Sequence, residues 1–592
     1  MTFKYFDCIK YRYVGDRMDG IFPQRANYYP VLGQLMNEMD LAGMINRVID
    51  IPDSQANIDV GTFVCLFIHH MLADVNVKMY KMDDFFTDKA MPLLVPWKPD
   101  IDINEINDDR AARVLDSIWE ANPQRVFSTM VDAAIPLHSL ETKIIHSDTT
   151  SKSFYGAYDF DTDTEDVPNI TYGYPKDHRP DLKQIVFGIG TTLDGIPIVG
   201  EVASGNESDM TLNGRWIKNL RKMLKKDKDD FLLYIGDSAL VTTDNLDHLY
   251  VEHMDFISRL PGRFDIEKEL KKKANLENDW EDIGKISDEK NAASYKAWDT
   301  TGEIEGRTYR FVVVYSDHKD KRKLKALNKA VDREYNNNMK RFEELSKRPF
   351  ACKKDAEIEV EKYQKNHSQK LHDIDWKIEV KEDKMKRKKR GRPKKNEKTK
   401  FQTNYYLTGT LKRNDDTYKM ERELCGQYVL ITSLKDTEKD SAQTILEKYK
   451  GQYYVERIFK FIKNPSWVGS FCLKKPERIA ALGYILFMAA VIYTLWERRV
   501  RMALDNEDSE PIEGLNRQKT KRPTAYALEV VLNPILVQSQ RIGGKIRIWL
   551  PRPLSRNKQR VIELSGFDVD IYQGEWAVGR KKINATKKGC EI

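Results

Sequence analysis

Apolar residues recur three and four positions apart through the first 135 residues, which is the spacing of amphipathic and buried helices. The runs YYPVLGQLMNEMDLAGMINRVID (28–50) and VGTFVCLFIHHMLADV (60–75) show this pattern most clearly. We therefore predict a separate helical N-terminal domain over residues 1–135. His69 and His70 fall in the second run, without acids or cysteines beside them, and are expected to pack in its core rather than bind a metal.

The pattern then changes to that of β-strands. Three strand-like runs are KIIHSDTT (143–150), LKQIVFGIGTTLDG (182–195) and IPIVGEVASG (196–205), and the turn containing Asp194 makes the last two a hairpin. Next come a helix, a strand (231–237), a second helix and a strand (254–260), and we expect Asp209 and Asp244 to cap the two helices. The order β-β-β-α-β-α-β is that of a ribonuclease-H-like fold, so we predict an α/β core that begins with residues 136–265.

Charged helical stretches interrupt this core pattern after Pro261. KRKLKALNKAVDREYNNNMKRFEEL (321–345) is the longest, and strand-like runs such as TYRFVVVYS (308–316) alternate with such stretches. We predict a mixed, highly charged insertion domain over residues 266–436. The core resumes over residues 437–504, with one helix from Thr437 to Lys463 and another from Pro476 to Leu504. Residues 505–592 are predicted to form a small C-terminal domain whose role the pattern does not indicate.

One segment is apolar enough to raise the question of a membrane. The 18 residues from Ile479 to Trp496 carry no charge, which just reaches the length needed to span a bilayer. The run contains glycine, tyrosine and threonine and continues a charged helical pattern. We therefore predict a buried core helix, and a membrane span is the alternative.

Composition narrows the class of protein. Hydrophobic residues make up 41% of the 592 residues and charged residues 32%, which provides material for cores in several domains and excludes wholesale disorder. The six cysteines are scattered singly, so neither a disulfide framework nor a zinc site is predicted. The N-terminus has no apolar segment behind a basic start, and we expect a cytoplasmic protein.

Positive charge is concentrated in one part of the predicted insertion. The net charge is only +7, yet residues 381–400 hold nine Lys and three Arg against three acids. Within the segment 386–396 (KRKKRGRPKKN), Arg390, Gly391, Arg392 and Pro393 resemble an AT-hook, a peptide that fits the narrow minor groove of A·T-rich DNA. Groove-specific binding, a sequence-tolerant DNA clamp and plain solvated surface are the alternatives, and the long charged helices are either an exposed hairpin or an arm over DNA.

Two acids stand where apolar strands end. Asp148 closes KIIHSD, and Asp237 closes LLYIGD. Ligand sites in open α/β sheets form at the carboxyl edge, so the two carboxylates are predicted to converge there. A single aspartate at a strand end is more often a cap or a turn residue than a catalytic group.

A third acid comes from the predicted helix that ends at Lys463. Tyr449, Gln452, Glu456 and Lys463 are spaced by three, four and seven residues, which places all four on one face of a continuous helix. The face presents a carboxylate together with a phosphate-seeking lysine. An ordinary amphipathic helix with solvated charges has the same spacing.

Together these segments resemble a known family. The spacing Tyr449-x2-Gln452-x3-Glu456-x6-Lys463 is similar to the Tyr-Arg-Glu-Lys signature of bacterial transposases of the insertion-sequence-four superfamily, in which Gln452 replaces the arginine. HSDTTS around Asp148 and GDSAL around Asp237 resemble the acidic blocks of that superfamily. HRPDLKQIVFG (178–188) and GNESDM (205–210) resemble the branch that carries a helical N-terminal domain.

The resemblance implies a DDE transposase. Asp148, Asp237 and Glu456 would hold two Mg²⁺ or Mn²⁺ ions, first for hydrolysis of a DNA strand and then for attack of the freed 3′-OH on target DNA. Tyr449 and Lys463 would hold a DNA hairpin, and the N-terminal domain would bind the transposon ends. At position 452 a glutamine can donate a hydrogen bond but supplies neither charge nor a bidentate fork, so DNA contact there is expected to be weaker.

The implied partners are the inverted-repeat ends of an insertion sequence and target DNA, with a homodimer in the synaptic complex. The implied location is the bacterial cytoplasm in association with the nucleoid, and no membrane is expected. Two alternatives remain. A transposase-derived DNA-binding protein would lack turnover, and a ribonuclease-H-like nuclease would cut without joining strands.

Overall fold

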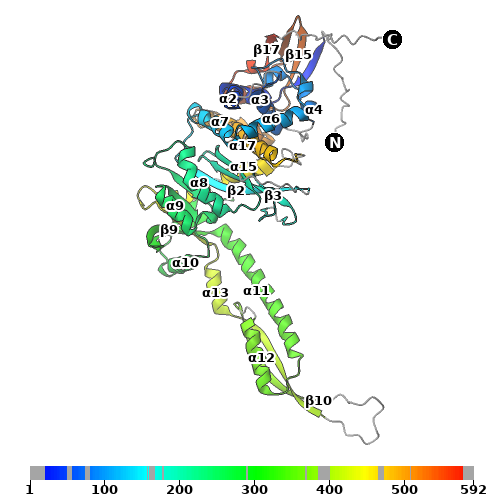
Figure 1. Ribbon diagram of the computed structural model, residues 1–592. Helices are drawn as coiled ribbons and strands as arrows, with labels where there is room; N and C mark the ends of the chain where they lie inside the picture. Colours follow the sequence, from blue (N-terminus) through cyan, green and yellow to red (C-terminus); the bar gives the residue numbers. More distant parts are fainter. Residues whose placement is uncertain are drawn as a thin grey trace, which may run out of the picture. The chain divides into compact units, whose positions relative to one another are not determined.

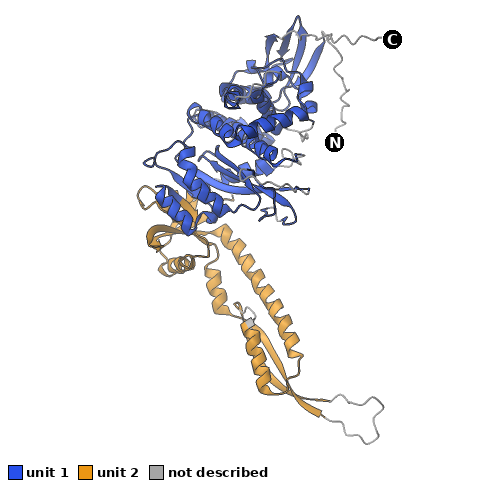
Figure 2. Cartoon of the chain, in the orientation of Figure 1, with its two compact units in different colours: residues 1–256, 448–592 blue, residues 257–447 orange. Residues whose placement is uncertain are grey.

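The computed structural model describes residues 20–577 except for 50–56, 74–80, 157, 159–166, 177–178, 288–290, 367–369, 385–400, 464–472 and 507. The chain divides into two compact units, which Figure 2 colours separately. Unit 1 comprises residues 1–256 and 448–592, and unit 2 comprises residues 257–447. The predicted insertion, 266–436, is thus somewhat shorter than unit 2. The AT-hook-like residues Arg390 to Pro393 lie outside the described residues.

The first part of unit 1 is helical, as the apolar spacing predicts. Its main helices are α1 (Tyr29–Glu38), α2 (Leu41–Ile49), α3 (Val60–Met71), α6 (Asp108–Glu120) and α7 (Pro123–Leu137). His69 is completely buried, and its Nε2 atom lies 2.9 Å from the carbonyl oxygen of Leu94. The histidine therefore packs in the core and has a backbone partner.

The two ends of unit 1 share a sheet that the sequence pattern does not predict. Strand β1 (Ile21–Arg25) pairs antiparallel with β15 (Leu536–Ile542), and β16 (Lys545–Trp549) and β17 (Gly574–Ala577) extend the sheet. The limits of the predicted N-terminal domain, 1–135, and C-terminal domain, 505–592, stay predictions, because both segments belong to unit 1. Their strands are joined by backbone hydrogen bonds, so the two segments are not independent of each other.

The centre of unit 1 is a mixed sheet flanked by helices (Figure 1). Its strands follow the order β4-β3-β2-β5, in which β2 is antiparallel to β3 and parallel to β5. The elements are β2 (Ile144–Phe154), β3 (Lys183–Thr191), β4 (Pro197–Ser204), α8 (Asp209–Met223), β5 (Leu233–Gly236), α9 (Thr243–Val251) and, at its end, β6 (Asp255–Arg259). The predicted order β-β-β-α-β-α-β and the β3–β4 hairpin are confirmed.

Two local predictions are wrong. Ser208, not Asp209, caps α8, because its side chain accepts the hydrogen bond of Thr211 N. Thr242, not Asp244, caps α9 by accepting from Asn245 N. Hydroxyl side chains one or two positions upstream thus satisfy the first free amides, which leaves Asp209 in the first helical turn for other contacts.

The prediction of one continuous helix over Thr437–Lys463 is also wrong. It is two helices, α14 (Ala442–Lys450) and α15 (Tyr453–Lys463), with a turn at Gly451 and Gln452. A Cβ atom on residue 451 would lie 2.7 Å from His146 Cε1, so the close approach to β2 requires glycine here. Glycine is also a poor helix former, and the helical pattern of apolar residues on either side does not reveal the break.

Helix α17 (Pro476–Leu504) has the limits that the sequence predicts and is the buried core helix of unit 1. It is long and apolar enough to cross a membrane, and 89% of its apolar window is buried in the structure. It packs on β4 and on helices α1, α3, α6 and α7. The approach to the sheet uses small residues: Gly483 lies against Phe187 and Val202, and Gly200 lies against Phe487.

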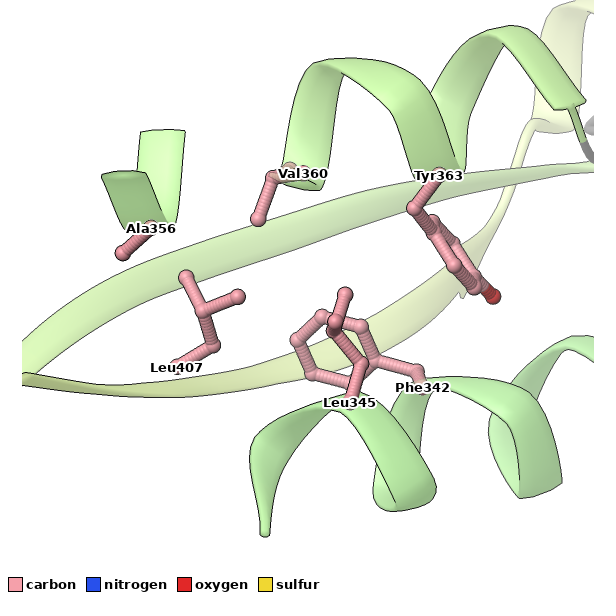
Figure 3. Packing of buried hydrophobic residues seen from close by; sticks show 6 residues of the cluster. All are labelled: Phe342, Leu345, Ala356, Val360, Tyr363 and Leu407. Carbon is pink, nitrogen blue, oxygen red and sulfur yellow. The ribbon is translucent and has the colours of Figure 1, made fainter. Parts of the chain in front are cut away.

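Unit 2 joins a second group of strands to a charged, elongated part. Strands β6, β12 (Gln427–Thr432), β9 (Arg307–Ser316), β8 (Ser294–Ile304) and β7 (Glu281–Lys285) pair in that order, antiparallel wherever a register is defined. Helices α11 (Asp317–Ser346) and α12 (Lys353–Asn366) pack on the ribbon of β10 (His372–Lys384) and β11 (Phe401–Arg413). Figure 3 shows the small core between them, formed by Phe342, Leu345, Ala356, Val360, Tyr363 and Leu407. The charged helices are therefore built around apolar contacts.

We predict that Glu497→Ala lowers the stability of unit 1 by about 3 kcal/mol, because it leaves two partly buried arginines without their carboxylate. Glu497 is 5% exposed and lies 2.5 Å from Arg457 and 2.8 Å from Arg501, and it also accepts from Ala525 N. Urea unfolding followed by tryptophan fluorescence measures the loss. The control is Glu510, which is 77% exposed and pairs with Arg560, and Glu510→Ala should cost less than about 1 kcal/mol. Equal losses for the two variants would contradict the prediction.

Candidate active site

The register of β2 against β5 brings two acids to one edge of the sheet. The strands are parallel, and His146 is the partner of Ile235. Asp148 and Asp237 each lie two residues further along, so they are neighbours on the same side of the sheet. Asp237 directly follows the carboxyl end of β5, whereas Asp148 lies within β2, which continues to Phe154. The two acids converge as predicted, but the prediction that a strand ends at Asp148 is wrong, because the polar residues after Asp148 continue β2 in its pairing with β3.

A buried tyrosine locks the strands in this register. The hydroxyl of Tyr234, on β5, lies 2.7 Å from Ser147 Oγ on β2 and 2.7 Å from Asn213 Oδ1 on α8. Tyr234 is fully buried, and burial raises the pKa of its phenol. A neutral hydroxyl therefore joins β2, β5 and α8 immediately behind the two acids.

The backbone around each acid is already hydrogen-bonded to it. Asp148 Oδ1 accepts from Thr149 N at 2.7 Å, and Asp237 Oδ1 accepts from Ala239 N at 2.9 Å. Asp237 thereby caps the short 3₁₀ helix at Ser238–Leu240. These bonds fix the orientation of the carboxylates without neutralising their charge.

A lysine lies among the acids. Lys176 Nζ is 3.2 Å from Asp209 Oδ2 and 3.8 Å from Asp148 Oδ1. It also donates to the carbonyl oxygen of Thr149 at 2.6 Å and to Thr149 Oγ1 at 2.5 Å. Thr149 Oγ1 in turn donates to Asp209, so the hydroxyl links the lysine to the helix α8 carboxylate.

Burial raises the pKa of both Asp148 and Asp237. Burial is the main cause of the shift that brings the pKa of Asp148 to about 7, and the nearby Asp237 adds to it while Lys176 opposes it. Burial likewise raises the pKa of Asp237, with Asp209 adding to the effect. The side chain of Asp148 keeps 26% of its surface exposed, so it is enclosed by protein but open to the cavity. The cost of removing the Asp148 carboxylate from water therefore outweighs its attraction to Lys176.

Helix α15 brings the third acid to the same place. Asp148, Asp237 and Glu456 all line one cavity of about 620 Å³, together with Thr149, Thr150, Lys176, Phe459, Lys460 and Lys463. The helix packs on β2 and β3, and its Arg457 is paired with Glu497 of α17. Glu456 and Lys463 are seven residues apart on α15, about two turns, and so share one face.

Two residues of the predicted helix face do not line the cavity. Tyr449 belongs to α14 and Gln452 to the turn before α15, so the break at Gly451 separates them from Glu456 and Lys463. Gln452 Nε2 is buried without a hydrogen-bond partner among the described residues. The expectation that all four side chains share a face is therefore wrong.

The oxygen ligands of the cavity suit a hard divalent cation, although the carboxylates do not form a preassembled metal site among the described residues. Among the residues that the structure describes, no three His, Cys, Asp or Glu side chains are close enough to hold a metal ion. Three carboxylates nevertheless open on one cavity, and an ammonium group already sits against oxygen atoms of Asp148 and Asp209. Oxygen ligands and excess negative charge are what Mg²⁺ and Mn²⁺ require.

Sequence reasoning missed Lys176 and the role of Asp209. Thr149 and Thr150 also line the cavity, and their position directly after Asp148 in the sequence could have indicated this. Lys176 is 28 residues from Asp148 and belongs to no regular element, and Asp209 has the sequence context of a helix cap. No local pattern indicates that these two residues meet.

Comparison with known proteins gives a family match that includes Asp237 and Glu456 but begins after Asp148. Residues 170–492, more than half of the chain, match the family described as "Transposase DDE domain", and residues 23–132 match "Domain of unknown function (DUF4277)". No curated protein matches the chain.

Two solved structures are distantly similar. The piggyBac transposase in its synaptic complex with hairpin DNA is 10% identical with a TM-score of 0.35, over 87% of this chain and 82% of that one. The Mos1 transposase in its paired-end complex with the left transposon end is 9% identical with a TM-score of 0.14, over 31% and 59%. Because both TM-scores are below 0.5, these similarities add nothing to the family match.

We predict that stability in EDTA depends on pH through Asp148. The folded pKa of about 7 lies above the value of about 3.9 expected for an unfolded chain. The contribution of Asp148 is therefore fully present below about pH 4 and is lost as pH rises to about 7. Urea-unfolding midpoints of Asp148→Asn, relative to the unsubstituted protein, should increase from about pH 4 to about pH 7 and then level off. A difference that stays constant over this range would show that the carboxyl is not perturbed.

Proposed function

Because the chain belongs to the transposase DDE domain family, we propose that it is a cut-and-paste DNA transposase whose active site is the cavity of unit 1. The observation that carries this proposal is that Asp148, Asp237 and Glu456, far apart in sequence, line one cavity. The strand order β4-β3-β2-β5, with β2 and β5 parallel, supports a ribonuclease-H-like core. Unit 2 would then be the insertion that interrupts this core.

The three carboxylates would hold the catalytic cations, two Mg²⁺ or Mn²⁺ ions. Bound there, such ions activate the attacking oxygen and stabilise the leaving oxygen of a phosphodiester. Asp148 and Asp237 are fixed by Thr149 N and Ala239 N, so they would present their remaining oxygen lone pairs to the cavity. Glu456 is exposed on α15 and would complete the set after a small movement of the helix or of its own side chain.

The lysines on α15 would position the DNA. Lys460 and Lys463 line the cavity on the same helix as Glu456, so a phosphate held by them would lie beside the acids. Their charge also offsets the repulsion between the acidic cavity and a polyanion. Phe459 is buried at the cavity wall and supports the helix face that presents these groups.

The finer features of the signature belong to this proposal as well. Tyr449 and Gln452 would contact DNA beyond the cavity, and Gln452 would contribute one hydrogen bond in place of the charge of an arginine. The basic segment 386–396 would clamp DNA through phosphate contacts. Inverted-repeat ends, a homodimeric synaptic complex and a cytoplasmic location at the nucleoid complete the proposal.

We predict that Asp148→Ala, Asp237→Ala and Glu456→Gln each reduce DNA cleavage by at least about 10³-fold, because the acids act as a unit. The assay incubates the purified full chain with Mg²⁺ and a duplex that carries the inverted repeats flanking its gene, and follows nicking and strand joining on gels. Glu447→Gln is the matched control, since Glu447 is an exposed glutamate on α14 that does not line the cavity. Cleavage that persists in the three variants would assign the nuclease activity elsewhere, and a chain that binds the repeats without cutting would be a DNA-binding derivative.

We predict that Lys463→Glu reduces cleavage by at least about 100-fold, whereas Lys463→Arg keeps most of it, because the lysine acts as a cation for a phosphate near the scissile bond. Thermal unfolding of the two variants separates this loss from misfolding. A Lys463→Glu protein with full cleavage activity would remove the lysine from the site.

A further inference from the structure

The ammonium group of Lys176 occupies a cage made only of oxygen atoms. Its neighbours are the carbonyl and hydroxyl oxygens of Thr149, a carboxylate oxygen of Asp209 and, slightly further away, one of Asp148. Carbonyl, hydroxyl and carboxylate oxygens are also the ligands that hard divalent cations select. The ammonium group therefore occupies a position whose oxygen neighbours would also suit a metal cation.

The chain holds Lys176 at this place by its backbone. Lys176 N donates to Ser151 Oγ on β2 at 3.1 Å. Earlier in the same segment, Thr171 exchanges two backbone hydrogen bonds with Gln184 of β3. The backbone is thus docked on β2 and β3 beyond Asp148, while the side chain, 36% exposed, reaches the acids through rotatable bonds.

We propose that Lys176 is the built-in counter-cation of the active site: its ammonium holds the acids in the metal-free protein and competes with the divalent cation, so that metal binding is coupled to withdrawal of the Lys176 side chain. This inference rests on the proposed function, since it concerns the same carboxylates. It adds a positioning residue that the motif spacing does not include. It also gives Asp209 a role, as the carboxylate that keeps the lysine in the cage.

The competition follows from charge. A divalent cation bound by Asp148 and Asp237 would lie within a few ångströms of the present Nζ position, and repulsion between the two positive groups is strong in a partly enclosed cavity. A lysine side chain has four methylene groups and a strongly hydrated head, so it can swing to water while its backbone stays docked. Displacement therefore requires only side-chain rotation, and no strand has to move.

Lys460, a second lysine of the cavity, does not have this arrangement. Lys460 lines the cavity from α15 and is exposed, and it makes no ion pair with a described acid. Its charge acts on the acids only from a distance and through solvent, where salt screens it. Lys460 therefore provides a matched control: a lysine of the same cavity outside the oxygen cage.

The test measures Mn²⁺ binding to the full chain without DNA, by the loss of the free-ion electron paramagnetic resonance signal. In Lys176→Met, which keeps the side chain as far as its ε position and removes the charged group, the dissociation constant should fall by about tenfold or more. Lys176→Arg should stay within about threefold of the unsubstituted protein, and Lys460→Met should change it less than about twofold. In parallel, Mn²⁺ should raise the thermal unfolding midpoint of Lys176→Met more than that of the unsubstituted protein.

The outcomes separate this inference from the proposed function. If the unsubstituted chain binds Mn²⁺ and Lys176→Met binds it equally or more weakly, Lys176 supports the metal site and the counter-cation role is overturned. If neither protein binds Mn²⁺, the metal assignment of the acids fails, and the inference fails with it. Thermal unfolding in EDTA shows that each variant is folded, and an unfolded Lys176→Met would leave the decision to Lys176→Gln in the same titration.

Discussion

The parallel pairing of β2 with β5 is the constraint on which the site depends. It brings two carboxylates together, and burial raises the pKa of both, with Asp237 adding to the shift of Asp148 and Asp209 adding to that of Asp237. Such an arrangement persists only if the surroundings hold it, and here Tyr234 locks the strands while backbone amides and Lys176 bind the acids. Two ionised carboxylates close together in a partly buried site are unfavourable by themselves, and binding of a cation would remove this cost.

The third acid depends on the packing of unit 1 as a whole. Glu456 reaches the cavity because α15 lies on β2 and β3, and α15 is held there by Arg457 and Glu497 of the buried helix α17. Gly451 allows the chain to turn against His146, whose pKa burial lowers to about 4, so a neutral ring sits beneath the turn. The acid on α15 and the acids on the strands are thus related through the core rather than through direct contact.

The extent to which the sequence predicts this arrangement follows the range of the forces involved. The apolar runs predict β5 and the first half of β2, and an uncharged run predicts α17, because burial acts along each element. The polar second half of β2, from Asp148 to Phe154, is not predicted by that pattern. The break at Gly451 depends on a contact with His146, about 300 residues away, and the cage of Lys176 depends on α8 meeting a loop. Periodicity contains no information about such contacts. The cap of α8 was missed for a smaller reason, since serine and aspartate are both good caps and stand side by side.

The cavity carries acids from β2, β5 and α15 and lysines from α15. Acids from the strands attract cations, and Lys460 and Lys463 on α15 attract phosphate. On the proposed function, a phosphodiester between them would be attracted by both the lysines and the bound cations, so metal and DNA would each raise the affinity for the other. Lys176 would oppose metal binding while DNA is absent, because its ammonium group already pairs with Asp148 and Asp209. On this proposal, Lys176 would keep the carboxylates assembled in the metal-free protein, and the ionised carboxylates would be released to the metal only when metal and DNA bind together.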